Sequence, residues 1–329
     1  MAGSSLNQNP PNADRHITTG GSDWLWAVFA IMALATLGMI AWSFTRPRGT
    51  RLFHNIATVI LTTSTVAYFA MASDLGATPV RAEFGRGTTN TRQIWFVRYI
   101  QWFINFPLLV ILILYTSGLS LSDILTTAFF AWVAVVCGLV GALTSSTYKW
   151  GFFVLGVAAL LYIWSSLLAH GSRSTFAAGP GVRSGYVRGA GIVAFLTMLY
   201  PICWGVSEGG NVISPTGEMI FYGILDLLLG PLFLYYFVWG LRNVDYGLWG
   251  FNSGRHTDGG YGNNGVGHGH VGAGYGEKSG AGARTGAGLG PGAGGVGTGG
   301  GVGTGGAGVG PHAGANAPMA GNHIGNAVV

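Results

Sequence analysis

Charged side chains are scarce in this sequence. Asp, Glu, Lys and Arg make up 8% of its 329 residues, whereas hydrophobic residues make up 49%. Soluble domains carry about 25% charged residues, so the composition excludes an ordinary soluble globular protein. Lysine is almost missing, with only Lys149 and Lys278 in the whole chain. Cysteine is equally rare, and Cys137 and Cys203 both fall in apolar stretches, which favours buried thiols over a disulfide or redox role.

Long apolar runs fill most of the first 245 residues. Seven of them are long enough for a helix to cross a hydrocarbon core of about 30 Å at about 1.5 Å per residue. The connections between them are mostly short, which predicts antiparallel neighbours in one bundle. The predicted fold class is therefore an all-α membrane protein, a seven-transmembrane-helix bundle embedded in the lipid bilayer. The runs cover residues 23–44, 52–76, 93–115, 119–143, 148–170, 184–207 and 216–242.

Arginines predict how the bundle lies in the membrane. Three occupy the first loop, 45–51, and three more occupy the segment 171–188. Positively charged loops stay on the cytoplasmic side, so with seven spans we expect the N-terminus outside and the C-terminus in the cytoplasm. The net charge of +5 is then an orientation signal, and no nucleic-acid partner is expected.

Composition divides the chain into three regions. Residues 1–21 are polar, with no apparent signal peptide, and are expected to form an extracellular N-terminal tail. Residues 22–249 form the membrane domain. From residue 251 onward, 30 of 79 residues are glycine. A segment of this composition buries too little apolar surface to offset the conformational entropy that it would lose on ordering. We therefore predict a disordered cytoplasmic tail over 250–329, whose role stays open.

Polar residues inside apolar runs are candidate functional residues. Four side chains of the third run share one helical face, and these are Arg98, Gln101, Trp102 and Asn105. A charge buried in a membrane needs a partner, and Asp226 in the seventh run is the natural one for Arg98. Two roles stay open for this pair, namely a structural ion pair between two helices and a part of a functional site.

Aromatic residues accompany this face. Tyr200 and Trp204 share a helical face with Thr197 in the sixth run, and Tyr68 and Met71 form a similar pair in the second. An aromatic stripe by itself is typical of core packing. Combined with the polar face and Asp226, the set predicts a small-ligand pocket between helices.

These residues resemble the microbial (type I) rhodopsins. The stretches RYIQWFINFPLL, CGLVGALT and LYPICWGVSEGG are similar to motifs of the third, fourth and sixth helices of that family, and DLLLG is similar to its seventh-helix Asp-x-x-x-Lys. The resemblance covers about residues 22–245 and implies a bundle of the bacteriorhodopsin type, with Glu208 and Glu218 as its outer carboxylates.

Three positions depart from the light-driven members of that family. Gly230 stands where their lysine forms a Schiff base with retinal, and covalent attachment needs a primary amine, so covalent retinal is not expected. Gln101 replaces the primary proton acceptor, and Leu112 replaces the internal proton donor of many pumps. The counterion-type cluster becomes Arg98, Gln101 and Asp226. The resemblance leaves a vestigial retinal pocket of Tyr68, Met71, Trp102, Asn105, Thr197, Tyr200, Trp204, Asp226 and Gly230.

This combination is similar to the fungal opsin-related proteins, the family of the yeast plasma-membrane thirty-kilodalton heat-shock protein. That resemblance implies a retinal-independent, non-enzymatic plasma-membrane protein of stress response or regulation. It further implies a proton ATPase as partner or a chaperone-like role, and a homo-oligomer such as a trimer. One alternative is a binder of small hydrophobic, sterol-like molecules or a light-independent transporter that uses the pocket. A photoreceptor or ion pump with noncovalent retinal is another.

Overall fold

Long helices dominate the structure, a computed structural model that describes residues 2–47, 50–84 and 91–242. Within these residues, seven helical segments are long and apolar enough to cross a membrane, and each coincides with a predicted run. The fold class predicted from the sequence is thus confirmed. The segments are α2 (Thr19–Phe44), α3 (Leu52–Ala72), α4 (Phe96–Tyr115), α5 (Leu121–Leu143), Lys149–Ser174 with α6 and α7, Pro180–Gly209 with α8, and Pro215–Gly240 with α9 and α10.

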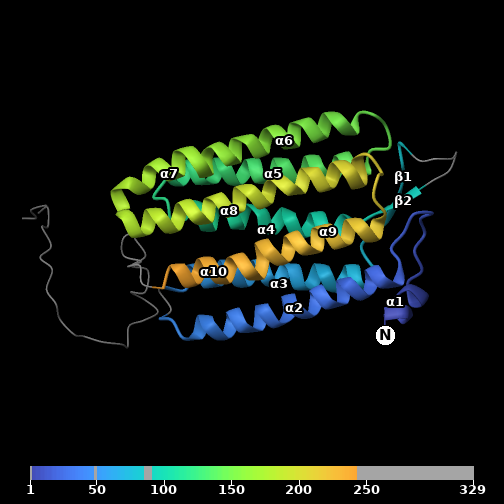
Figure 1. Cartoon of the computed structure of the whole chain (residues 1–329), viewed down its shortest axis with the longest axis horizontal. Helices are drawn as coiled ribbons and strands as arrows, with labels where there is room; N and C mark the ends of the chain where they lie inside the picture. Colours follow the sequence, from blue (N-terminus) through green and yellow to red (C-terminus); the bar gives the residue numbers. More distant parts are fainter. Residues whose placement is uncertain (1, 48–49, 85–90, 243–329) are drawn as a thin grey trace, which may run out of the picture. The chain divides into compact units, whose positions relative to one another are not determined.

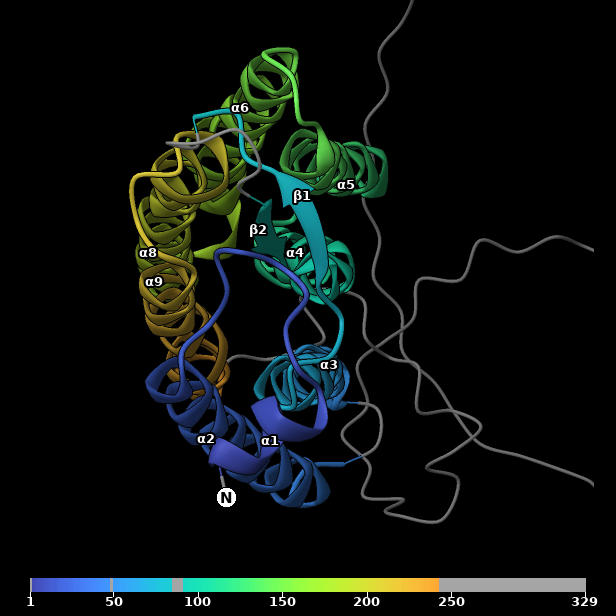
Figure 2. The same ribbon diagram turned by 90° about the vertical axis from the view of Figure 1, so that its right-hand side faces the viewer.

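The helices close into a bundle (Figure 2). Consecutive helices pack side by side from α2 to α6, and α9 returns to contact α2. Side-chain caps begin three of the spans, because Thr18, Ser120 and Ser214 each accept a hydrogen bond from a backbone N–H of the first turn. Such caps satisfy N–H groups that have no partner within the helix. The apolar core lies between the helices, whereas many large apolar side chains face outward, as expected in lipid.

Three spans are interrupted by a π-helical turn. These turns cover Ser166–His170 between α6 (Lys149–Ser165) and α7 (Gly171–Ser174), Gly205–Gly209 after α8 (Pro180–Trp204), and Leu228–Leu232 between α9 (Pro215–Leu227) and α10 (Phe233–Gly240). A 3₁₀ turn, Thr175–Ala178, joins α7 to α8. Pro231 in the last π-helical turn has no N–H to continue the helical ladder. Turns of this kind often mark functional sites, and this one contains Gly230.

One end of the bundle, called here the hairpin end, carries α1 (Ala2–Gln8) and the antiparallel strands β1 (Thr78–Arg81) and β2 (Thr91–Ile94). The hairpin occupies most of the connection between the second and third predicted runs. Figure 2 shows the N-terminal segment crossing this end beside β2. The backbone N–H of Arg15 donates to Thr91 O at 2.9 Å, and the N–H of Gln93 donates to Arg15 O at 2.9 Å.

The segment predicted as the N-terminal tail, residues 1–21, is held in place by backbone and side-chain contacts. Its backbone satisfies the open edge of β2, and Ile17 is fully buried, so it packs onto the hairpin end. Thr18 N donates to Thr216 Oγ1 at 3.0 Å, which ties the segment to α9. The predicted glycine-rich tail over residues 250–329 lies outside the described residues.

The first arginine-rich loop and α7, which contains Arg173, lie at the same end of the bundle, as the loop charges predicted (Figure 1). Arg46 Nη1 lies 3.5 Å from the carbonyl oxygen of Arg242 at the end opposite the hairpin. At the hairpin end, Lys149 Nζ lies 3.7 Å from Glu83 Oε2. Cys137 and Cys203 are both free, and Cys203 is buried.

Asp74 links the end of α3 to the hairpin and is expected to make stability depend on pH. Its backbone lies in the left-handed region at φ 58°, and its Oδ1 accepts a hydrogen bond from Gln93 Nε2 at 2.7 Å. Partial burial raises the pKa of Asp74 above its usual 3.8. Because the folded state favours the protonated form, the stabilising contribution is present below pH 3.8 and is lost as the pH rises through the raised pKa.

Asp74→Asn keeps the shape, the acceptor and a residue that tolerates this backbone while removing the charge. We expect the variant to unfold at a higher temperature than the natural chain at neutral pH, and the difference to vanish below pH 3.8. Thermal unfolding in detergent across this pH range measures it. A difference that does not change with pH would contradict the role of the Asp74 charge.

Candidate functional site

The carboxylate of Asp226, on α9, is the centre of a buried polar cluster. Its Oδ2 accepts hydrogen bonds from Tyr68 Oη at 2.7 Å and Gln101 Nε2 at 3.1 Å. Its Oδ1 accepts from Tyr200 Oη at 2.6 Å and Trp102 Nε1 at 3.3 Å. Donors from α3, α4 and α8 thus converge on one carboxylate. Four donors occupy about as many acceptor sites as one carboxylate offers.

Arg98 does not pair with Asp226, and the sequence prediction of that pair is wrong. Arg98 Nη1 lies 2.6 Å from Glu218 Oε1 and 3.6 Å from Glu208 Oε1. The reason is depth in the bundle. Helices α4 and α9 both run inward from the hairpin end, so Arg98 near the start of α4 lies level with Glu218 near the start of α9, whereas Asp226 lies deeper.

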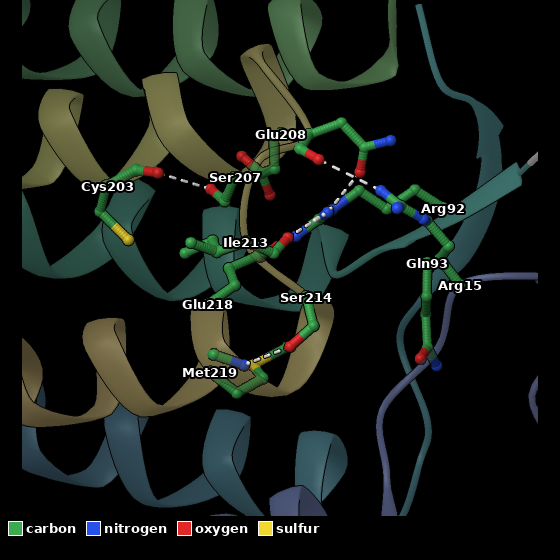
Figure 3. Close-up of polar contacts among 12 residues, drawn as sticks. Arg15, Arg92, Gln93, Cys203, Ser207, Glu208, Ile213, Ser214, Glu218 and Met219 are labelled. Carbon is green, nitrogen blue, oxygen red and sulfur yellow. Dashed lines mark hydrogen bonds and ion pairs between the residues drawn. The ribbon is translucent and has the colours of Figure 1, made fainter. Parts of the chain in front are cut away.

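Arg92, on β2, completes an ion-pair cluster with Arg98, Glu208 and Glu218. Its Nη2 lies 2.6 Å from Glu218 Oε2, and its Nη1 donates to Ile213 O at 2.8 Å. Figure 3 shows Arg92 reaching from the strand toward Glu218 and Ile213. All four members of the cluster are buried. Two cations balance two anions, which offsets much of the cost of removing each charge from water.

Aromatic residues join the ion-pair cluster to the polar cluster. Tyr99 Oη donates to Glu208 Oε2, and the Arg98 guanidinium lies 4.2 Å from the ring centroid of Tyr222. Tyr222 also packs edge-on against Trp102, with ring centroids 4.9 Å apart. The two clusters are therefore neighbouring layers, with the ion pairs toward the hairpin end.

A cavity of about 140 Å³ adjoins Asp226. Seven residues of the predicted pocket line it, namely Trp102, Asn105, Thr197, Tyr200, Trp204, Asp226 and Gly230. The other two lie in the apolar core next to it. Neither Tyr68 nor Met71 lines the cavity, although Tyr68 donates to Asp226 as described. Most of the remaining lining residues are apolar, and α5 and α6 supply eight of them.

Three polar residues on the cavity wall form a chain of hydrogen bonds. Ser64 Oγ donates to Ile60 O at 2.9 Å, so its oxygen is left to accept from Asn105 Nδ2 at 2.9 Å and Gln101 Nε2 at 3.3 Å. This arrangement fixes which way both amides point. The oxygens Gln101 Oε1 and Asn105 Oδ1 are buried without a hydrogen-bond partner in the structure.

Gly230 leaves room in the wall beside Asp226. A Cβ atom there would meet Met32 Cε at 3.6 Å, Met32 Sδ at 3.8 Å and Leu61 Cδ2 at 3.9 Å, which are ordinary van der Waals contacts. Lys149 is held at the hairpin end, where its Nζ lies 3.7 Å from Glu83 and 3.5 Å from the carbonyl oxygen of Glu208.

The far wall is shaped by hydrogen bonds to indole rings. Thr197 Oγ1 accepts from Trp164 Nε1 at 2.9 Å and donates to Val193 O at 2.7 Å. Trp204 Nε1 donates to Gly138 O at 3.1 Å. These contacts fix the aromatic walls and leave their polar atoms satisfied, so this side of the cavity offers mainly apolar surface.

Comparison with known proteins agrees with this geometry. Residues 19–231 match the model of the family described as bacteriorhodopsin-like protein. The match spans more than half of the chain, and the chain belongs to this family. The fold and the buried site thus define an opsin-like integral membrane protein.

Its relatives include fungal proteins. The chain is 60% identical to Protein FDD123 of Trametes versicolor, over 78% of this chain and 90% of that protein. It is 42% identical to the opsin-like protein carO of Fusarium fujikuroi, over 73% and 81% of the two chains. It is 37% identical to the 30 kDa heat shock protein of Saccharomyces cerevisiae, over 70% and 75%. The predicted resemblance to fungal opsin-related proteins is confirmed.

Solved structures with the same fold include two light-driven proton pumps. The rhodopsin CsR of Coccomyxa subellipsoidea is 32% identical, with a TM-score of 0.66 over 68% of this chain and 98% of that chain. The pump LR (Mac) of Leptosphaeria maculans is 29% identical, with a TM-score of 0.66 over 70% of this chain and 99% of that chain.

The sequence did not single out several members of the site. Arg92 lies just before the third predicted run, where an arginine suggests exposure to solvent, and it is buried instead. Ser64 is a small polar residue of the second run, and no pattern in the sequence distinguished it from its neighbours. Tyr222 precedes Asp226 by one helical turn, and this spacing is the signal that could have placed it in the pocket.

Glu218→Gln is expected to destabilise the bundle more than Glu208→Gln. Glu218 contacts both Arg92 and Arg98 at 2.6 Å, whereas Glu208 lies 3.6 Å from Arg98 alone. Removing one partner of a buried ion pair costs about 3 to 5 kcal/mol of unfolding free energy. Thermal unfolding of the full chain in detergent, followed by circular dichroism, measures both variants. An equal loss in the two would contradict Glu218 as the centre of the ion-pair cluster.

Proposed function

We propose that this protein is a retinal-independent, opsin-related membrane protein of stress response or regulation, without light-driven pumping or enzymatic chemistry. The observation that carries the proposal is Gly230 in the cavity wall, at the place of the retinal lysine. A Schiff base requires a primary amine. Lys149 is held at the hairpin end by Glu83, and Lys278 lies outside the described residues and beyond the family match.

The proton route of a pump also lacks its usual groups. Gln101 stands at the acceptor position, and its amide donates to Asp226 and Ser64. An amide does not take up a proton near neutral pH. Leu112 stands at the internal donor position and is fully buried. Both residues support a role other than light-driven proton transfer, although solved structures similar to this chain include light-driven proton pumps.

A relative named for heat shock supports the proposed role in stress. We further propose a plasma-membrane location with the hairpin end outside, because Arg46, Arg51 and Arg173 lie at the opposite end of the bundle and positively charged ends stay cytoplasmic. The proposed partner is another membrane protein, such as a proton ATPase, or a client of a chaperone-like activity. A homo-oligomer such as a trimer belongs to the same proposal.

The cavity favours a second candidate, noncovalent binding of a small hydrophobic molecule. The cavity is retained at about 140 Å³ beside Asp226, and its walls are mostly apolar with a few polar groups, as in known ligand sites. Binding there would give a regulatory protein its signal, and a light-independent transporter would use the same site.

The full chain, expressed with added all-trans retinal, is expected to show no visible absorption band that hydroxylamine bleaches. The physical reason is the missing amine in the cavity. Cell suspensions are expected to show no light-dependent change of external pH. A stable, hydroxylamine-sensitive band, or pH changes on illumination, would overturn the proposal that the protein is retinal-independent.

Gly230→Lys is expected to restore pigment formation with retinal. A Cβ atom at this position meets its neighbours at 3.6 Å or more, and Gly230 lines the cavity together with Asp226, so the lysine amine is expected to reach the cavity. Pumping is not expected, because Gln101 and Leu112 remain. Absorption spectra measure the pigment, and Gly240→Lys is the matched control on the same span, where nothing lies within 4 Å. Failure of Gly230→Lys to bind retinal in a folded protein would show that the pocket no longer fits this chromophore.

A further inference from the structure

Buried charges in the described residues do not all find partners. In the ion-pair cluster, Arg92 and Arg98 balance Glu208 and Glu218. Asp226 has four hydrogen-bond donors, and all of them are neutral side chains. A buried carboxylate surrounded only by neutral groups gains substantially from a nearby cation. The cavity beside Asp226 is the open side from which a cation can approach.

Two amide oxygens near Asp226 lack a hydrogen-bond donor. Gln101 Oε1 and Asn105 Oδ1 are buried without a hydrogen-bond partner in the structure. Their amide nitrogens are committed to Ser64. The indole N–H of Trp102 already points at Asp226. The residues that line the cavity include Asp226 and no lysine or arginine, so among the described residues the wall carries a carboxylate and no cation.

We propose that the cavity binds a small apolar amine as its ammonium ion. The head lies among Asp226, Gln101 and Asn105, and the body lies along the apolar wall. This inference rests on the second candidate function, noncovalent ligand binding in the cavity. An ammonium ion supplies the positive charge that the surroundings of Asp226 lack, and it donates hydrogen bonds and accepts none. The rings of Trp102 and Tyr200 line the same cavity and attract a cation through their faces.

An organic cation fits this site better than a metal ion. Hard metal ions take about six or more oxygen ligands, whereas most of this cavity wall is apolar. Gly230 and Asp226 line the same cavity. The cavity of about 140 Å³ is close to the roughly 150 Å³ of a dry protein cavity that binds benzene. The ligand is therefore expected to have a body about the size of one ring.

Three compounds of one skeleton test the proposal: benzylamine, benzyl alcohol and toluene. Binding to the purified full chain in nonionic detergent at neutral pH is measured by calorimetry and by tryptophan fluorescence, because Trp102 and Trp204 line the cavity. Benzylamine is expected to bind about tenfold tighter than benzyl alcohol, since a charge-assisted hydrogen bond is about twice as strong as a neutral one. Toluene is expected to bind without the gain from the head group.

Variants separate the head site from the apolar wall. Asp226→Asn is expected to remove the preference for the amine and to leave toluene binding unchanged. Asn105→Leu removes one acceptor and is expected to weaken the amine alone, which keeps the test available if Asp226→Asn does not fold. Gly230→Met fills the cavity and is expected to abolish binding of all three compounds. Gly240→Met, with nothing within 4 Å of its Cβ, is the matched control and is expected to bind like the natural chain.

The outcomes distinguish the two proposals. If all three compounds bind and the amine has no advantage, or keeps its advantage in Asp226→Asn, the amine proposal is overturned and ligand binding by the cavity stands. If none binds, both fall. If sodium ions displace the amine from the natural chain and not from Asp226→Asn, the site selects metal ions and the amine proposal is overturned.

Discussion

One carboxylate, Glu218, determines how the charges of this bundle are arranged. It binds Arg92 from the hairpin and Arg98 from α4 at once, so it joins three parts of the chain at the hairpin end. Because the four members of the ion-pair cluster are buried and balanced, each depends on the others for a tolerable electrostatic energy. The same contacts draw Arg98 away from Asp226. The polar layer beneath is thereby left with a carboxylate and neutral donors.

That separation gives the site its chemical character. Hydroxyl, amide and indole groups from α3, α4 and α8 hold Asp226 in place, and the cavity meets it on the side of Gly230. In opsins that carry the lysine, a cation attached to the chain stands there. In this protein, neutral hydrogen-bond donors take the place of that cation in stabilising the Asp226 carboxylate. Family membership therefore specifies the helix bundle, whereas Gly230, Gln101 and Asn105 determine which ligands its cavity can bind.

Much of the fold and the pocket could be predicted, because the length of the apolar runs indicates membrane spans and the helical spacing of residues indicates which of them share a face. Seven apolar runs indicated seven spans, and helical spacing placed Trp102, Tyr200 and Trp204 around one cavity. The ion pairs could not be predicted, since spacing along a helix gives the face and leaves open the depth at which two helices meet. Arg98 thus lay level with Glu218. The buried Arg92 and the N-terminal segment were missed because polar stretches outside the apolar runs carry no periodic signal of burial.

The N-terminal segment has a consequence for the order of assembly. Arg15 pairs with β2, which follows two complete spans, and Thr18 bonds to Thr216 at the start of α9. These contacts join the first residues of the chain to parts synthesised much later. The segment can therefore close over the hairpin end only after the last span has been inserted. Its contact with Thr216 then joins the first and last membrane-spanning segments of the bundle.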